Sequence, residues 1–348
     1  PGNFRCLARF RAGAVRRMSA DAAPEGYGAK ELRAAYGLPA KGGTGTVAIV
    51  DAYGYPKAAA DLAKYRKQFG LPACTKANGC LSIVNQDGKP SPLPEGDPGW
   101  AVESALDLQM ASAACPSCKL LLVQGDDASF EALAAAENTA VQLGASVVSN
   151  SYGADEFNGM DEFAGAYQHD GVPILASSGD YGFTTASFPA VLDNVISVGG
   201  TSLKKADNAR GYSESAWEGA GSGCSAWVEK PAWQHDENCA MRTIADVSAV
   251  ADPDTGVAVY DTYGLGEDAG WLIVGGTSAA SPFVAGVVAL GGHPGTVTNQ
   301  KLYGEPTKFH DVVGGSNGFC GGDYLCTGVK GYDGPTGLGS PKGITPFS

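Results

Sequence analysis

Blocks of apolar and polar positions alternate along most of the chain, and their lengths predict strands and helices in turn. Short apolar runs ended by polar residues are typical of strands buried on both faces of a sheet, and we expect them at 47–50, 119–125, 145–153 and 172–180. Longer segments with helical character predict helices at 29–39, 58–70, about 100–113, 129–144 and 281–290. Strands that alternate with helices predict an α/β fold: a mainly parallel central sheet with helices on both faces.

Polar residues end several of the predicted strands, among them Asp51, Asp126, Ser149, Ser151 and Asp180. In open α/β sheets, ligands bind beyond the carboxyl ends of the strands. These residues are therefore the first candidates for a functional site.

The domain organisation that we expect is one domain over residues 25–348, because the chain shows no internal repeat and no second hydrophobic domain. Residues 1–24 differ in character: the stretch "FRCLARFRAGAVRR" carries five arginines without periodicity, and a small, polar stretch follows. We expect residues 1–24 to be a linker or the remnant of a propeptide, and an upstream segment to have been removed.

Composition limits the classes of function. The 348 residues are 44% apolar, which is enough for a sizeable core, and 50 glycines with 20 prolines indicate many tight turns. A net charge of -13 argues against nucleic acid and anionic membranes as partners. No run approaches the roughly 18 apolar residues of a membrane span, and none resembles a signal peptide.

Eight of the nine cysteines fall into pairs of near neighbours along the chain: Cys74 with Cys80, Cys115 with Cys118, Cys224 with Cys239, and Cys320 with Cys326. An oxidising compartment permits such short disulfide loops, although sequence alone does not fix the connectivity. "CPSC" at 115–118 could be a redox motif, but it lacks a thioredoxin-like context, and no cysteine and histidine spacing for zinc occurs. We expect structural disulfides, with Cys6 left over.

Candidate chemistry begins at "VGGTSAASPFVAG", residues 274–286, where Ser278 follows a glycine turn and precedes an apolar helix. A serine at this place is often only a helix cap. The full string is rarer, with Pro282 early enough to be tolerated in the helix. It resembles the nucleophile region of the subtilisin clan.

Histidine is the usual base for a serine nucleophile, but none of the four histidines lies in a His-Gly-Thr-His-type stretch; they are His169, His235, His293 and His310. Glu103 and Asp107 are an alternative, because their spacing places them together at the edge of the apolar stripe of the predicted helix. Repulsion and partial burial raise carboxyl pKa values and favour one shared proton. Taken without Ser278, two solvated acids on a helix would be the simpler explanation.

Taken together, Glu103-x-x-x-Asp107, Asp180 in "SSGD" and Ser278 in "GGTSAASP" resemble the sedolisin family of serine-carboxyl peptidases. "GYGAKELRAAYGL", "FPAVLDNVISVGGTSL" and "KGYDGPTGLGSP" match as well, so the resemblance runs from about Tyr27 to the C-terminus. It implies a subtilisin-like, three-layer α/β domain. It also implies that Glu103 is the general base toward Ser278 and that Asp107 orients Glu103.

The resemblance implies further that Asp180 and the Ser278 N–H form the oxyanion hole. A carboxylate base works best near acidic pH, and Asp180 can donate to an oxyanion only while protonated, so activity is expected in acid. Asp51 is either a plain strand-end acid or part of a hydrogen-bond network behind the glutamate. By analogy with the clan, the primary substrate pocket is walled by Ser151, Tyr152, Gly153 and the strand before Asp180.

A calcium site is expected near the C-terminus, in "HDVVGGSNG" and "VKGYDGPTGLG". Carboxylates and free carbonyls on glycine-rich turns suit a hard cation. The resemblance implies one structural Ca²⁺ held by two carboxylates and three backbone carbonyls, which map onto Asp311, Val312, Val329, Gly331 and Asp333.

We therefore expect a secreted, monomeric, acid-active endopeptidase that acts on protein or peptide substrates, with its own propeptide as inhibitor and folding aid. Several alternatives stay open: a tripeptidyl aminopeptidase of the same family, a peptidase with a histidine triad, and a non-catalytic relative that binds peptides or calcium. A further alternative is an unrelated esterase-like α/β protein, but the sequence contains no G-x-S-x-G turn that would support it.

Overall fold

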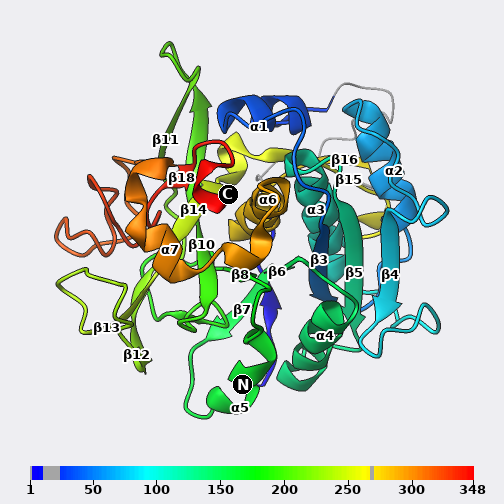
Figure 1. The fold of residues 1–348 in the computed structure, drawn as a ribbon, viewed down its shortest axis with the longest axis horizontal. Helices are drawn as coiled ribbons and strands as arrows, with labels where there is room; N and C mark the ends of the chain where they lie inside the picture. The colour runs from blue at the N-terminus through cyan, green and yellow to red at the C-terminus, as the bar shows by residue number, and fades with distance from the viewer. Residues whose placement is uncertain (1, 11–23, 267–269) are drawn as a thin grey trace.

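An eight-stranded, mainly parallel sheet forms the middle layer of the molecule (Figure 1). The computed structural model describes residues 2–10, 24–266 and 270–348. Neighbouring strands follow the order β11-β10-β8-β6-β3-β5-β4, and β14 also pairs with β10. Every pair is parallel except β10 with β11. The strands are β3 Thr46–Ala52, β4 Leu81–Asn85, β5 Lys119–Gly125, β6 Val147–Asn150, β8 Ile174–Ser177, β10 Val195–Lys205, β11 Tyr212–Ala216 and β14 Val247–Val250.

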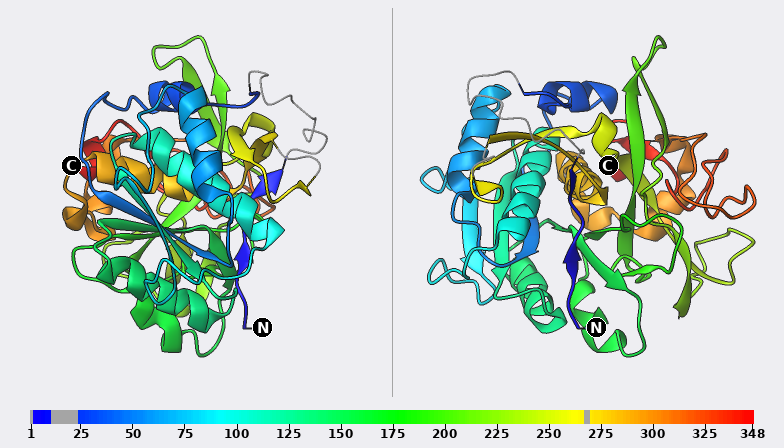
Figure 2. Two further views of the ribbon diagram at one scale, coloured as in Figure 1. Left: turned by 90° about the vertical axis from the view of Figure 1, so that its right-hand side faces the viewer. Right: turned by 180° about the vertical axis from the view of Figure 1, so that it is seen from behind.

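Helices cover both faces of this sheet, and the left view of Figure 2 shows the resulting layers. Helices α1, α2, α3 and α6 pack together on one face, while α4 packs on β3 and β5 from the other. The helices are α1 Ala29–Ala35, α2 Ala58–Gln68, α3 Pro98–Ala114, α4 Phe130–Gln142, α5 Asp161–Ala164, α6 Thr277–Leu290 and α7 Asn299–Gly304. Short 3₁₀ turns are η1 Gly165–Tyr167, η2 Pro253–Thr255, η4 Pro294–Thr296, η5 Pro306–Lys308 and η6 Thr345–Phe347.

The two faces of the sheet carry separate apolar cores because side chains alternate along each strand. In β3, Val47 and Ile49 belong to the core under α3 and α6, whereas Ala48 and Val50 belong to the core under α4. Strand residues buried on both sides explain why β3 is an unbroken apolar run in the sequence. The predicted α/β fold with three layers is confirmed.

Within the described ranges, four small antiparallel sheets surround the central one, in the orders β1-β7-β9, β15-β16-β2, β12-β13 and β17-β18. Their strands are β1 Arg5–Cys6, β2 Arg9–Phe10, β7 Tyr152–Asp155, β9 Ser187–Phe188, β12 Gly223–Glu229, β13 Met241–Ile244, β15 Val257–Asp261, β16 Gly270–Gly275, β17 Phe309–His310 and β18 Ser340–Pro341. Two of these sheets contain a strand from residues 2–10. The remainder of the predicted leader, residues 11–23, lies outside the described residues.

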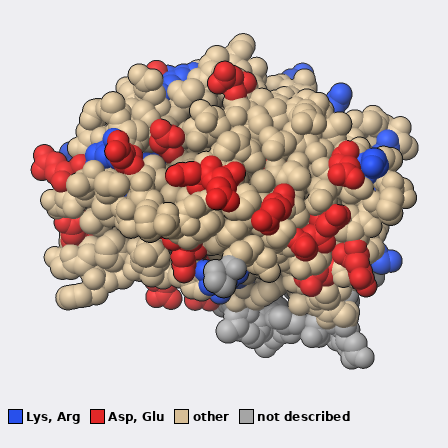
Figure 3. All heavy atoms as spheres, turned by 90° about the horizontal axis from the view of Figure 1, so that it is seen from below, with Lys and Arg blue, Asp and Glu red and all other residues tan. Residues whose placement is uncertain are grey.

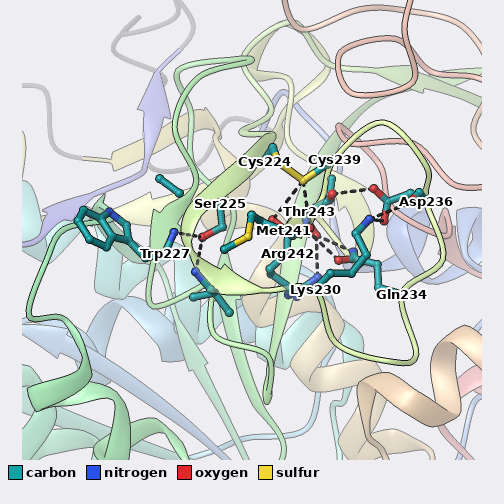
Figure 4. Close-up of a disulfide and its surroundings, with 12 residues drawn as sticks. Cys224, Ser225, Trp227, Lys230, Gln234, Asp236, Cys239, Met241, Arg242 and Thr243 are labelled. Atoms are coloured by element: carbon teal, nitrogen blue, oxygen red, sulfur yellow. Dashed lines mark hydrogen bonds and ion pairs between the residues drawn. A yellow bond between two sulfur atoms is a disulfide. The ribbon is translucent and has the colours of Figure 1, made fainter.

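Disulfides join the four pairs of neighbouring cysteines, and Cys6 is free, as expected: Cys74–Cys80, Cys115–Cys118, Cys224–Cys239 and Cys320–Cys326. Figure 4 shows the bridge between Cys224 and Cys239, which are 15 positions apart and close the loop between β12 and β13. Within this loop, Gln234 donates to the carbonyl of Thr243 at 2.8 Å and accepts from its N–H at 2.9 Å. The disulfide and these bonds hold a long hairpin connection that has few helical or strand hydrogen bonds of its own.

Acidic side chains gather on the surface that Figure 3 shows, in keeping with the negative net charge. None of the helices in the described part of the chain is long and apolar enough to cross a membrane.

Candidate active site

Ser278 lies in the first turn of α6, directly after strand β16. Gly276 joins the two elements with φ = 94°, a conformation that L side chains rarely adopt. A Cβ on Gly276 would also collide with the carbonyl oxygen of Leu7. Glycine at this position therefore permits both the sharp turn and the close approach of another chain segment to Ser278.

Pro282 lies inside α6, four residues after Ser278, and its ring nitrogen offers no N–H to the Ser278 carbonyl. The Ser151 hydroxyl donates to this carbonyl instead, at 3.4 Å. The Ser278 hydroxyl in turn donates to the Ser151 carbonyl at 3.3 Å. The break in the helix ladder thus ties the serine turn to the end of strand β6.

Helix α3 carries Glu103 and Asp107 and packs against α6. Asp97 caps α3 by accepting from the N–H of Trp100 at 3.0 Å. The two helices approach closely at Gly286, where a Cβ would lie 2.6 Å from the Cβ of Ala114. This contact fixes the distance between the helix that carries the acids and the helix that carries the serine.

The expectation that the two acids are only partly buried is wrong. Every residue of α3 from Trp100 to Ala114 is buried, because α1, α2, α6 and β15 surround the helix on its face of the sheet. Glu103 and Asp107 are both 0% exposed. Their burial is complete rather than partial, which strengthens the expected effect on their pKa values.

Three buried carboxyl groups meet at this place: Asp51 at the end of β3, and Glu103 with Asp107 on α3. Burial, and then the charge of Asp51, raise the pKa of Glu103 well above its usual value, while the hydroxyl of Ser278 opposes this rise. Burial, Asp51 and Glu103 raise the pKa of Asp107 in the same way. Burial also raises the pKa of Asp51 to about 7, against the effect of the Ser104 hydroxyl. Groups that interact so strongly share protons rather than titrating singly.

Asp180 approaches the serine turn from the segment after β8. Its Oδ1 accepts from the N–H and the hydroxyl of Thr277, each at 2.8 Å. Burial raises the pKa of Asp180 to about 6, while Thr277 and the guanidinium of Arg9 hold it lower than burial alone would. Asp180 therefore lies beside Ser278. Its carboxyl group changes from neutral to charged between acidic and neutral pH.

The predicted pocket residues 151–153 pair with the N-terminal segment. The Ser151 carbonyl accepts from the N–H of Leu7 at 3.3 Å. Tyr152 and Gly153 lie opposite Cys6 and Arg5 in the β1–β7 ladder. The ring of Tyr152 is fully buried, and its hydroxyl donates to Asn150 at 2.8 Å, so its side chain lies within the core.

Among the described residues, none of the four histidines hydrogen-bonds to Ser278, Glu103 or Asp180. His169 lies 2.9 Å from the carbonyl of Ala166, His310 is in β17, and His235 and His293 lie in loops. Carboxyl groups, not imidazoles, surround the serine.

The residues of the expected calcium site lie on neighbouring loops near the C-terminus. The N–H of Gly331 donates to both carboxylate oxygens of Asp311, at 3.1 and 3.2 Å. The N–H of Val329 donates to Asp333 at 3.1 Å. Val312, next to Asp311, is buried. The two halves of the predicted ligand set are therefore adjacent, although 20 positions separate Asp311 from Gly331.

Asp333 is the residue whose surroundings best test a cation at this place. It is 0% exposed, and burial raises its pKa to about 7, with a further contribution from the charge of Asp311. Two carboxylates that repel each other, with Asp333 buried and Asp311 exposed, fit a hard cation. No cluster of three or more His, Cys, Asp or Glu side chains with metal-site geometry occurs in the described ranges, so backbone carbonyls would supply the other ligands.

Sequence reasoning missed three contributors to this site. Ser104 faces Asp51 from α3, and Thr277 holds Asp180. The N-terminal segment was expected to be a linker or propeptide remnant, and nothing in its sequence indicated that it lies against Glu103. There the N–H groups of Leu7 and Ala8 donate to Glu103 Oε2, at 2.7 and 2.8 Å. The pairing of Asp180 with Thr277 could have been found only once the order of the strands in the sheet was known.

Comparison with known proteins assigns residues 99–293 to the subtilase family. Kumamolisin of Bacillus sp. (strain MN-32) is 30% identical, over 97% of this chain and 66% of that protein. Tripeptidyl-peptidase 1 of Dictyostelium discoideum is 28% identical, over 81% and 50%. The chain thus spans between half and two thirds of the length of these relatives. Pseudomonas sedolisin, described as a serine-carboxyl proteinase and solved with two molecules of pseudo-iodotyrostatin, superposes with a TM-score of 0.76 at 26% identity, over 92% of this chain and 96% of that one.

Proposed function

The chain belongs to the subtilase family and, within it, to the sedolisins, and on that basis we propose that it is an acid-active serine-carboxyl endopeptidase. The observation that carries this proposal is the burial of Glu103 and Asp107 beside Ser278, on a helix packed against that of the serine. Solvated surface acids would not be enclosed in this way. Burial of unpaired charge is unfavourable and is found where a site requires it.

In the proposed reaction, the Ser278 hydroxyl attacks the substrate carbonyl, and Glu103 accepts the hydroxyl proton. Glu103 then returns this proton to the leaving nitrogen, and water hydrolyses the acyl-enzyme. Asp107 acts as the positioning residue that shares a proton with Glu103, and Asp51 extends the network behind it. Support comes from the mutual effects of the three carboxyls on their pKa values.

Charge on the substrate oxygen is stabilised, in this proposal, by the Ser278 N–H and the protonated carboxyl of Asp180. A neutral carboxylic acid can donate such a bond, whereas a carboxylate repels the oxyanion. With a pKa of about 6, Asp180 is protonated in acid and ionised above neutrality. We therefore expect activity to be greatest well below neutral pH.

A structural Ca²⁺ would be held by the carboxylates of Asp311 and Asp333 and by the carbonyls of Val312, Val329 and Gly331. When bound, the ion would neutralise the repulsion between the two carboxylates and fix the C-terminal loops. The disulfides and the negative surface support secretion of the protein. In this proposal the substrates are proteins or peptides, and the chain acts as a monomer.

The decisive experiment compares the pH–rate profile of the wild type with those of Glu103→Gln and Ser278→Ala on an unfolded protein substrate. We expect both variants to lose at least two orders of magnitude in kcat, with unchanged near-UV circular dichroism as evidence of folding. Glu137→Gln is a matched control, because Glu137 is another fully buried glutamate but lies on α4, on the opposite face of the sheet. Activity retained in Glu103→Gln, or an optimum above pH 7, would overturn the carboxyl-base mechanism.

A further inference from the structure

A cavity of about 390 Å³ opens between three segments that lie far apart in the sequence. They are the loop between β12 and β13, helix α7, and the loops of residues 320–333. Figure 1 shows α7 and the β12–β13 hairpin on one side of the molecule, while α3, which carries Glu103 and Asp107, lies on the other. Among the described residues, the lining of this cavity includes none of the proposed catalytic groups.

Three tyrosines line the cavity: Tyr303 from α7, and Tyr324 and Tyr332 from the loops near the C-terminus. The ring of Tyr332 lies 5.8 Å from that of Tyr303 and 6.1 Å from that of Tyr324, inclined by 40° and 54°. Rings inclined in this way form a concave wall rather than a flat platform. A concave aromatic wall suits a compact group that contacts several rings at once. We call this space the tyrosine cavity.

Hydrogen bonds hold two of these rings in place from behind. The hydroxyl of Tyr303 donates to Asp246 Oδ1 at 2.8 Å, and that of Tyr332 donates to the Ala245 carbonyl at 3.0 Å. Both acceptors belong to fully buried residues. Gln234, also buried, donates to the same two hydroxyls at 3.1 and 3.3 Å. The rings are therefore fixed before any ligand binds, and their hydroxyl protons are used within the protein.

The carboxylate of Asp236 lies between the third ring and the β12–β13 loop. It accepts from the hydroxyls of Tyr324 and Thr243, at 2.6 and 2.8 Å, and forms an ion pair with Lys230 Nζ at 2.7 Å. Figure 4 shows Lys230 and Thr243 converging on Asp236. Asp236 thus joins Tyr324 to the loop, and its charge is balanced by that of Lys230.

The other charges around the cavity leave its opening negative. Behind the rings, Arg242 is paired with Asp246 at 2.6 Å, and neither side chain is exposed. At the opening, Glu237 lines the cavity and is exposed. Asn238, which also lines it, donates to the carboxylate of Asp323 at 2.5 Å. Two carboxylates therefore lie at the opening, in a molecule whose net charge is -13.

We propose that the tyrosine cavity binds a small quaternary ammonium cation. The face of an aromatic ring attracts a cation that lies within about 6 Å of its centre. The acidic opening raises the local concentration of cations, and the volume of the cavity is in the ordinary range for small ligands. The same opening disfavours a phospholipid headgroup, in which a phosphate accompanies the cation. This inference does not rest on the proposed peptidase function.

Hydration favours a quaternary over a primary ammonium. A primary ammonium carries three N–H donors and is strongly hydrated, so it loses hydrogen bonds on entering a cavity of rings. The carboxylate of Asp236 does not replace that water, because Tyr324, Thr243 and Lys230 already occupy it. A trimethylammonium group has no N–H and requires only ring faces and negative surroundings.

The test titrates the full chain with choline and follows the line width of the choline N-methyl proton signal by nuclear magnetic resonance. It is run at pH 7.5, where histidine is mostly neutral, because His235 lines the cavity and an imidazolium would repel a cation. Ca²⁺ is kept in excess, so that the loops around Tyr332 stay in one state. The reference ligand is 3,3-dimethylbutanol, in which carbon replaces the charged nitrogen. We expect choline to bind about tenfold more tightly than this neutral analogue.

Two variants separate the ring of Tyr324 from its hydroxyl. Tyr324→Phe loses the bond to Asp236 but keeps the ring, and it should bind choline as the wild type does. Tyr324→Leu loses both, and its Kd should rise about tenfold. Phe319→Leu is the matched control, because Phe319 is 95% exposed on a neighbouring loop and does not line the cavity, so its Kd should not change. Near-UV circular dichroism checks the fold of each chain.

Equal binding of choline and the neutral analogue would overturn the proposal. Equal losses in Tyr324→Leu and Tyr324→Phe would do so too, since the missing hydroxyl would then account for both. Phosphocholine tests the kind of ligand: we expect weaker binding than that of choline, and equal or tighter binding would overturn the assignment to a free cation. None of these measurements involves turnover, so their outcome is independent of whether the chain is a peptidase.

Discussion

Replacing Asp180 by asparagine tests the proposed oxyanion hole independently of the other groups that would make activity greatest in acid. The asparagine side chain would have nearly the same shape, and its Oδ1 could still accept from the N–H and hydroxyl of Thr277, as Asp180 does at 2.8 Å. Its amide nitrogen would lie where Asp180 Oδ2 now lies. Unlike a carboxyl group, an amide donates at every pH.

The size of the effect follows from the pKa of Asp180, which burial raises to about 6. About a tenth of the wild-type molecules then carry the protonated acid at pH 7, and about a hundredth at pH 8. Loss of one oxyanion-hole donor lowers kcat by about 10²–10³, so only the protonated fraction contributes to the rate. The ratio of kcat/KM in Asp180→Asn to that in wild type should therefore rise about tenfold by pH 7 and about a hundredfold by pH 8, relative to pH 4.

Loss of the contact between Arg9 and Asp180 would make the expected rise in this ratio smaller. The Arg9 guanidinium lowers the pKa of Asp180 while the N-terminal segment is bound. Once that segment leaves, the pKa of Asp180 rises, and the ratio begins to climb at a higher pH. The tenfold and hundredfold values are thus upper bounds for chains whose N-terminal segment has left the site.

The assay measures kcat/KM on an internally quenched peptide from pH 3 to pH 8, for both chains under the same conditions. The ratio largely cancels the titration of Glu103, which both enzymes share. Asp193→Asn removes the same formal charge at an exposed position and should give a flat ratio. A ratio for Asp180→Asn that stays flat between pH 5 and pH 8 would refute the role of Asp180 as a protonated donor.

Three further predictions concern stability. EGTA should lower the melting temperature, and more at pH 7 than at pH 4. The pKa of Asp333 is raised to about 7, so the metal-free fold loses stability as the pH rises to and through that value, and the acid must ionise to bind Ca²⁺. An equal melting temperature with and without EGTA would rule out the calcium site. Replacing Cys224 and Cys239 by alanine should lower the unfolding free energy by about 3 kcal/mol, measured by urea denaturation, because the bridge spans 15 positions. Gly286→Ala should lower kcat and should lower the unfolding free energy by about 1–3 kcal/mol, because the added Cβ would lie 2.6 Å from an alanine Cβ of α3. Gly304→Ala is its control and should be neutral, because a Cβ there meets nothing within 4 Å.

The layers and the disulfide pairs could be predicted because they depend on local patterns. Apolar runs such as 47–50 are strands since both faces of the sheet are covered, and the helix expected at about 100–113 spans Pro98–Ala114. Each disulfide joins cysteines that are near in sequence, so few alternatives compete. The position of Ser278 followed from its glycine turn.

What could not be predicted depends on long-range pairing. Strands β1 and β2 contain two residues each, too few to show a period, and their partners lie more than 140 positions away. The complete burial of α3 also escaped prediction, because helical spacing indicates which residues share a face but not how many neighbours surround the helix. The contact between Thr277 and Asp180 needed the order of the strands.

A substrate that binds beside Ser278 in the way that β1 and β2 pair with β7 and β16 must be extended. A folded protein offers its backbone N–H and C=O groups to its own helices and sheets, so a stretch of roughly six or more residues must first detach before it can bind here. For the proposed peptidase, the rate on a compact protein substrate then reports how often that substrate opens locally. Acid, by destabilising most folded proteins, would supply the open chain as well as the protonated site.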